Sequence, residues 1–222
     1  DVADIPMLEH FAQQWGAASG LNFAETVFHP TDQGRSTVRV LRFDRVDGRR
    51  LMCISAASLL QAEYPGNLQQ TDRWSYPRLA EELRRIGAPA GDRIELFGRM
   101  VFNAVCGNDD DHVRNHAAVY RYGEGWRLAP AFDVVPCPAE TPDRLTMQLS
   151  AGRFDIARGA VLGDARRFGL ASVEEAENHL DALLGRIGNA FQQTVHLLSL
   201  PWQDVMRARL EKNMARLRPD GH

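Results

Sequence analysis

The chain has 222 residues and a mass of 24.9 kDa, which suffices for one large domain or for two small lobes that share a core. Its content of 44% hydrophobic and 25% charged residues is typical of a globular protein and argues against disorder. The formal net charge of −3 does not indicate a nucleic-acid binder. No apolar run approaches the roughly 18 residues of a membrane-spanning helix, and residues 1–12 have no basic signal-peptide start. We therefore expect neither a membrane protein nor a secreted one.

The cysteines and the lysine limit the chemistry that the chain can supply. Cys53, Cys106 and Cys137 are far apart and follow no metal-ligand spacing, so we expect buried, reduced thiols in a cytoplasmic protein. The 26 basic residues include a single lysine, Lys212. A mechanism that requires a catalytic lysine must use Lys212 or take its lysine from outside this chain.

Hydrophobic periodicity and turn residues divide the chain into helices and strands. Apolar side chains at helical spacing predict helices at 7–18, 56–61, 76–86, 92–106, 160–168, 173–198 and 202–218. Loosely alternating stretches and short apolar stretches predict strands at 25–29, 36–43, 51–54, 117–121 and 126–128. The helix at 92–106 is strongly apolar, and Asp92 is its expected N-cap. The fold class is therefore α+β, with a small mixed portion followed by a mainly helical portion that contains one embedded β-hairpin.

The densest polar chemistry lies between Asn108 and Asp133. Asp110 is followed five positions later by Asn115, and Asp133 comes after the hairpin. In protein kinases an Asp and an Asn at this spacing, followed by a further Asp, form the catalytic half-site. The first Asp orients the acceptor hydroxyl, and the Asn and the last Asp bind Mg²⁺. Because a hairpin returns the chain, Asn115 and Asp133 can meet on one ion with the hard oxygen ligands that Mg²⁺ prefers.

Two other interpretations of the acidic loop stay open at this point. Three consecutive aspartates also fit a solvated loop, and His112 fits a structural hydrogen-bonding role. A metal-dependent phosphohydrolase would use Asp109, Asp110, Asp111 and His112 as ligands. Consecutive residues of one loop cannot all converge on an ion, so the phosphohydrolase is the least favoured interpretation of the loop.

Two stretches together resemble the HipA family, the Ser/Thr kinase toxins of bacterial toxin–antitoxin modules. Residues 107–116 are similar to the family's N-x-D-x-H-x-x-N loop, and residues 125–136 are similar to its W-x-L-x-P-x-[FY]-D segment. Residues 42–45 look like the family's R-F-D-R, and residues 145–170 look like its later helical region. The resemblance therefore touches most of the chain.

This resemblance implies a protein-kinase-like fold with a mainly helical C-terminal lobe, an embedded β-hairpin and an incomplete small β lobe at the N-terminus. Residues 1–45 would be the remnant of the small lobe and hinge, and residues 46–222 the helical catalytic lobe. The family's phosphate-cradling loop and its phosphate-binding lysine have no counterpart in the sequence, because no G-x-G-x-x-G or Walker-type loop is present and Lys212 lies far from the expected place. We expect a fragment of a longer product rather than a degenerate copy or a chain completed by another.

The family's site residues carry over by position. Asp110 would be the catalytic Asp, and Asn115 and Asp133 the metal-binding pair. The other implied nucleotide-binding residues are His112 and Arg114 near the phosphates and Leu41, Arg42 and Phe43 at the hinge that meets adenine. Asp109 and Asp111 are expected to face solvent, because carboxylates that pointed at a phosphate would repel it.

The resemblance further implies a cytoplasmic bacterial toxin that uses ATP and Mg²⁺ to phosphorylate a protein such as an aminoacyl-tRNA synthetase. A HipB-like DNA-binding antitoxin would hold it in check, so that DNA is contacted only indirectly and no membrane is involved. The alternative is an inactive HipA-like fragment or pseudokinase that binds a nucleotide or a partner.

Overall fold

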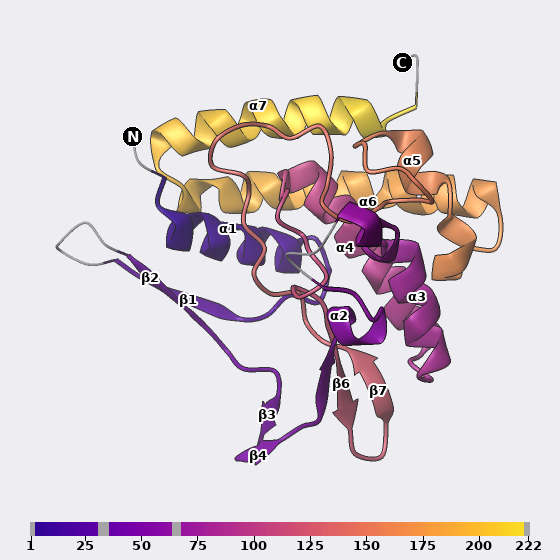
Figure 1. The fold of residues 1–222 in the computed structure, drawn as a ribbon. Coiled ribbons are helices and arrows are strands. Elements are labelled where there is room, and N and C mark those ends of the chain that lie inside the picture. The colour runs from indigo at the N-terminus through magenta and orange to yellow at the C-terminus, as the bar shows by residue number, and fades with distance from the viewer. Residues whose placement is uncertain (1–2, 31–35, 64–67, 220–222) are drawn as a thin grey trace.

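The computed structural model describes residues 3–30, 36–63 and 68–219 (Figure 1). The helices are α1 (Ile5–Ala18), α2 (Ala56–Leu59), α3 (Tyr76–Arg85), α4 (Ala90–Cys106), α5 (Arg158–Leu162), α6 (Val173–Thr194) and α7 (Leu200–Leu217), with 3₁₀ segments η1 (Leu68–Arg73), η2 (Ala165–Phe168) and η3 (Val195–Leu197). The strands are β1 (Thr26–His29), β2 (Thr37–Val40), β3 (Arg45–Val46), β4 (Arg49–Arg50), β5 (Cys53–Ser55), β6 (Ala117–Arg121) and β7 (Gly125–Leu128). This arrangement confirms the predicted α+β class. Among the described residues, no helix is long and apolar enough to cross a membrane.

The strands form small antiparallel sheets rather than one continuous sheet. Strand β1 pairs with β2, β3 pairs with β4, and β5, β6 and β7 form a three-stranded sheet. The predicted hairpin is present as β6 and β7. The strand predicted at residues 51–54 corresponds to β5, which pairs with β6 and places Ile54 opposite Ala118. Figure 1 shows the helices gathered in one part of the molecule, with the hairpins projecting from it.

Aromatic side chains hold α1, α4 and α6 in one core. The indole ring of Trp15 in α1 packs edge-on against Phe102 of α4 and Phe191 of α6, with ring centroids 4.9 and 5.1 Å apart. Its Nε1 atom donates to the carbonyl oxygen of Ile187 over 2.8 Å. Burying a Phe side chain stabilises a fold by roughly 1.5–3 kcal/mol. The first helix is therefore fixed against helices that follow it much later in the chain.

Several predicted helix limits differ from the structure. The predicted helix at 160–168 is two short segments, α5 and η2, interrupted at Gly163 and Asp164. The predicted helix at 173–198 ends at Thr194 and continues only as a 3₁₀ turn. Strand β2 ends at Val40, so residues 41–43, which the sequence predicts as strand, lie outside the ladder, and residue 43 begins a turn. Cys53 is exposed, whereas Cys106 and Cys137 are buried as expected.

The expected N-cap role of Asp92 is wrong. Helix α4 begins at Ala90 after Pro89, and no side chain caps it. The buried Asp92 carboxylate instead accepts hydrogen bonds from the guanidinium of Arg127, at 2.9 Å, and from the backbone N–H of Leu128, at 2.7 Å. The Asp92 carboxylate therefore binds partners on β7 instead of capping α4. These contacts connect α4 to the hairpin.

Asp92→Asn is expected to lower the free energy of unfolding by about 1–3 kcal/mol, because Arg127 loses its buried charged partner and keeps the exposed Glu124. The matched control is Asp155→Asn, which breaks the exposed ion pair between Asp155 and Arg153 and should change stability by less than about 1 kcal/mol. Urea denaturation followed by circular dichroism measures both. Equal losses in the two variants would contradict a stabilising role for the buried pair.

Candidate active site

The acidic loop starts at a fixed point at the end of α4. Gly107 follows the helix in the left-handed conformation, with φ of 73°. A Cβ atom at this position would lie 3.0 Å from Arg209 Cδ and 3.1 Å from Pro142 Cδ. Backbone conformation and lack of space both favour glycine here. The turn directs the chain away from the helix and into residues 108–116.

The side-chain amide of Asn115 joins the two acidic residues of the predicted half-site. Its Nδ2 atom donates to the carbonyl oxygen of Asp110 over 3.0 Å and reaches the carbonyl oxygen of Asp133 at 3.5 Å. Asn115 is buried, whereas the side chains of Asp110 and Asp133 are exposed. The structure therefore brings these three residues together, although Asp133 is separated from the other two by the β6–β7 hairpin.

Asp133 has an uncommon backbone conformation. Its φ of 57° places a non-glycine residue in the left-handed region, a conformation that Asp tolerates better than most residues. Such strain tends to occur where a side chain must be aimed at a functional site. The pKa of the Glu9 carboxylate in α1 is raised by burial and also by the negative charge of Asp133.

A pocket of about 520 Å³ lies beside Asp133, between α1, the end of β2 and the residues after β7. It is lined by Glu9, Val40, Leu41, Arg42, Phe43, Asp44, Cys53, Phe132 and Asp133. The rings of Phe43 and Phe132 lie 5.4 Å apart and form an apolar wall. All three residues predicted for the hinge, Leu41, Arg42 and Phe43, line this pocket.

Two polar groups of the hinge, the guanidinium of Arg42 and the backbone N–H of Leu41, already have partners. Arg42 donates two hydrogen bonds to the carboxylate of Asp44, at 2.8 and 2.6 Å, and this ion pair holds the pKa of Asp44 below its usual range. The backbone N–H of Leu41 donates to the carbonyl oxygen of Glu25. The apolar side chains are therefore the part of the hinge best placed to contact a flat ring.

The predicted phosphate residues lie on the loop but not in the pocket lining. The backbone N–H of His112 donates to the carbonyl oxygen of Asp110 over 2.9 Å, and its imidazole Nε2 lies 3.8 Å from Asp110 Oδ1. The Arg114 side chain is exposed. His112 therefore stays close to Asp110, and Arg114 faces solvent.

The expectation that Asp111 faces solvent is wrong. Its side chain is completely buried, and burial raises its pKa to about 8 even though its carboxylate accepts hydrogen bonds. Asp109 is half-buried, and Asp110 is exposed. Adjacent carboxylates thus point in different directions, which removes the geometric basis for the phosphohydrolase interpretation. Across the described residues, no group of three or more His, Cys, Asp or Glu side chains is arranged to hold a metal ion.

Sequence reasoning missed the contributions of Glu9, Val40, Asp44 and Cys53 to the pocket. Asp44 lies within the R-F-D-R stretch itself, and Val40 lies two residues before it, so extending the hinge prediction by one residue at each end would have included both. No local signal marks Glu9 or Cys53, because each faces the pocket only through the packing of α1 and β5 on the rest of the fold.

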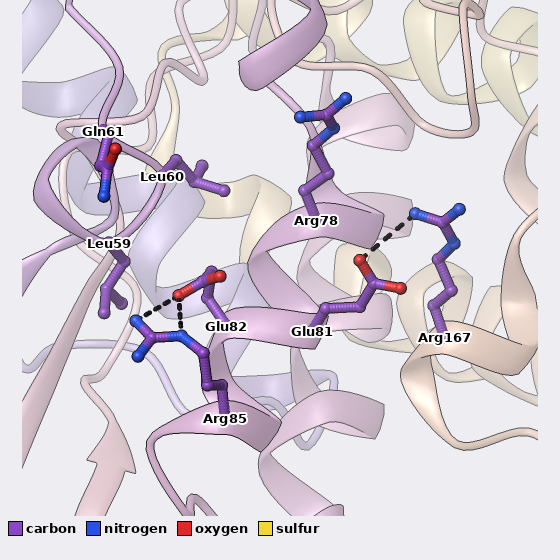
Figure 2. Close-up of a pocket in the computed structure, with 8 residues that line it drawn as sticks. All are labelled: Leu59, Leu60, Gln61, Arg78, Glu81, Glu82, Arg85 and Arg167. Atoms are coloured by element: carbon purple, nitrogen blue, oxygen red, sulfur yellow. Dashed lines mark hydrogen bonds and ion pairs between the residues drawn. The ribbon is translucent and has the colours of Figure 1, made fainter.

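A second pocket, of about 470 Å³, lies between the end of α2, α3 and η2 (Figure 2). Its charged groups largely compensate one another. Arg85 pairs with Glu82 at 2.6 Å, and Arg167 pairs with Glu81 at 3.5 Å, as Figure 2 shows. None of the residues predicted for the site lines this pocket.

The fold is that of the HipA-type kinases. The structure superposes on HipA of Shewanella oneidensis MR-1, solved with HipB and operator DNA, with a TM-score of 0.77 and 17% identity over 98% of this chain and 56% of that chain. It also superposes on the proinflammatory kinase CtkA of Helicobacter pylori, with a TM-score of 0.71 and 12% identity over 97% of this chain and 84% of that chain.

Residues 1–195 match the model of the HipA-like C-terminal domain, so the chain belongs to that family. It is also 30% identical over 137 residues to the putative kinase Y4mE of Sinorhizobium fredii (strain NBRC 101917 / NGR234). That alignment covers 57% of this chain and 31% of Y4mE. The chain thus spans about a third of this relative and about half of the HipA chain.

Proposed function

We propose that this chain is the nucleotide-binding and catalytic lobe of an ATP- and Mg²⁺-dependent protein Ser/Thr kinase of HipA type. One observation carries the proposal. The Asn115 amide contacts the backbone carbonyl groups of both Asp110 and Asp133, and Asp133 lines a pocket with an aromatic wall. This is the arrangement that phosphoryl transfer needs, because positioning and charge compensation supply most of the rate.

Each residue of the site has a distinct proposed role. The aromatic wall of Phe43 and Phe132 contacts adenine. The carboxylate of Asp133 and the side-chain oxygen of Asn115 hold Mg²⁺, which when bound offsets the charge of the ATP phosphates. Asp110 orients the acceptor hydroxyl and takes its proton. His112 and Arg114 lie on the loop near the phosphates.

The partners follow from the family. We propose that the whole protein is a cytoplasmic bacterial toxin, that its substrate is a protein such as an aminoacyl-tRNA synthetase, and that a HipB-like antitoxin binds it. The Shewanella HipA structure, which contains HipB and operator DNA, supports this partner. The phosphate loop and the phosphate-binding lysine would come from sequence outside this chain, with residues 1–45 as the end of the small lobe and hinge and 46–222 as the helical lobe.

The second candidate function is a nucleotide- or partner-binding module without phosphotransfer. It is favoured by the position of Lys212, the single lysine of the chain, which is exposed on α7, a helix that contributes no residue to the pocket. Phosphotransfer by the intact gene product separates the two candidates.

Asp133→Asn is expected to weaken Mg²⁺-dependent ATP binding at least about tenfold, because a carboxylate ligand of the cation is lost. Asp110→Asn should keep the wild-type affinity, since Asp110 acts on the acceptor. Its phosphotransfer rate in the intact gene product should fall about 10²–10⁴-fold. Calorimetric titration of ATP with and without Mg²⁺ gives the affinities. Equal weakening in both variants would contradict the division of roles.

Mg²⁺ and ATP are expected to protect Cys53 from alkylation by iodoacetamide, because its exposed thiol lines the proposed nucleotide pocket. Cys106 is the internal control. It is fully buried, and burial raises the pKa of its thiol to about 12, so it should remain unmodified throughout. Mass spectrometry of tryptic peptides measures both rates. Unchanged alkylation of Cys53 at saturating Mg²⁺ and ATP would place the nucleotide elsewhere.

A further inference from the structure

The buried Asp111 lies directly beside the exposed Asp110, and its carboxylate is held from two directions. Its Oδ2 atom accepts a hydrogen bond of 2.8 Å from the hydroxyl of Tyr76 in α3. Its Oδ1 atom accepts one of 2.8 Å from the backbone N–H of Thr146. Helix α3 and the segment around residue 146 therefore meet on a single side chain of the acidic loop.

The contacts of Tyr76 continue to the end of α4. The Tyr76 hydroxyl accepts a hydrogen bond of 2.7 Å from the side-chain amide of Asn103. The Asn103 side-chain oxygen in turn accepts one of 3.2 Å from Asn108, at the start of the loop. The Tyr76 ring also packs edge-on against His116, with ring centroids 5.2 Å apart. All these side chains are buried, so the network holds both ends of the loop from inside.

Thr146 holds both neighbours of Asp110. Its backbone N–H donates to the Asp111 carboxylate, and its hydroxyl donates to the carbonyl oxygen of Asp109. The side chain of Asp110 itself is 72% exposed. Fixing the residue on either side of Asp110 leaves its side chain little freedom to turn inward.

Burying a carboxylate costs free energy, because desolvation disfavours its charged form. The pKa of Asp111 is raised for this reason. Apolar side chains of similar size would give a packed loop without this cost. A carboxylate, unlike an apolar group, accepts hydrogen bonds in defined directions. The directed hydrogen bonds of the network therefore fix the orientation of the loop, which apolar packing alone would not do.

We infer that Asp111, Tyr76 and Thr146 form a bracket of positioning residues that fixes Asp110 in its outward orientation for phosphoryl transfer. The inference rests on the proposed function for its catalytic consequence. The fixing of the loop itself can be measured without any activity.

The first test compares Tyr76→Phe and Thr146→Val, which each remove one hydroxyl and keep the shape of the side chain. The matched control is Thr194→Val in α6, because the Thr194 hydroxyl is buried and donates within its own helix, to the carbonyl oxygens of Ala190 and Phe191. ADP release by the intact gene product with an aminoacyl-tRNA synthetase preparation as acceptor, measured over a range of ATP concentrations, gives kcat and KM, and thermal unfolding gives stability.

Both bracket variants should lower kcat about tenfold or more and leave the KM for ATP within about twofold, because a misplaced group impairs the chemical step while the nucleotide pocket is intact. Thr194→Val should lose stability without a change in kcat. Wild-type kcat in both bracket variants, or a loss that follows melting temperature equally in all three, would overturn the inference.

The second test measures hydrogen exchange in the 222-residue chain without nucleotide. Tyr76→Phe, Thr146→Val and Asp111→Asn should each accelerate exchange of the amides of residues 108–116 at least about tenfold, and Thr194→Val should not. Unchanged exchange in the three bracket variants would overturn the inference even if the protein is a kinase. If the wild-type gene product releases no ADP, the proposed function fails, and exchange alone decides whether the bracket fixes the loop.

Discussion

Complete burial of the second half of α4 is the constraint on which the site depends. Every residue from Leu96 to Cys106 is buried, so this helix contacts neighbours on all its faces. Trp15 packs against its Phe102, and the Asn213 amide of α7 donates to the carbonyl oxygens of Ala104 and Val105 near its end. Because these carbonyl groups have partners, the helix can end inside the protein. The acidic loop therefore begins at a helix end that α7 holds in place.

Two buried aspartates connect α4 to the strand that leads to Asp133 and to the loop that carries Asp110. Asp92, in the first turn of α4, holds Arg127 and Leu128 on β7, the strand that leads to Asp133. Asp111, beyond the other end of the helix, holds the loop that carries Asp110. Buried carboxylates are costly, and each is accommodated here by several donors. Helix α4 thus sets the separation between the two acidic residues of the site, and Asn115 closes the remaining gap between their backbones.

The sequence allowed much of this to be predicted, for identifiable reasons. The apolar pattern of α4 and the glycines of the hairpin are local signals, and the helix and the hairpin lie where these signals predict them. The spacing of Asp110, Asn115 and Asp133 predicts that they meet, and the Asn115 amide contacts the backbone carbonyl groups of the other two. The direction of a side chain in an irregular loop is not a local property. Asp111 is buried because Tyr76 and Thr146 reach it from distant parts of the chain. The role of Asp92 was misassigned for the same reason, since its partners lie on β7.

The charged side chains that line the pocket are mainly negative. Three carboxylates, those of Glu9, Asp44 and Asp133, line it together with the single guanidinium of Arg42. Arg42 is already paired with Asp44, and the pKa of Glu9 is raised, first by burial and then by the negative charge of Asp133. Such a lining repels a polyanionic nucleotide until cations offset it. Under the proposed function these cations are Mg²⁺ at Asp133 and a basic group that the described lining of the pocket does not supply.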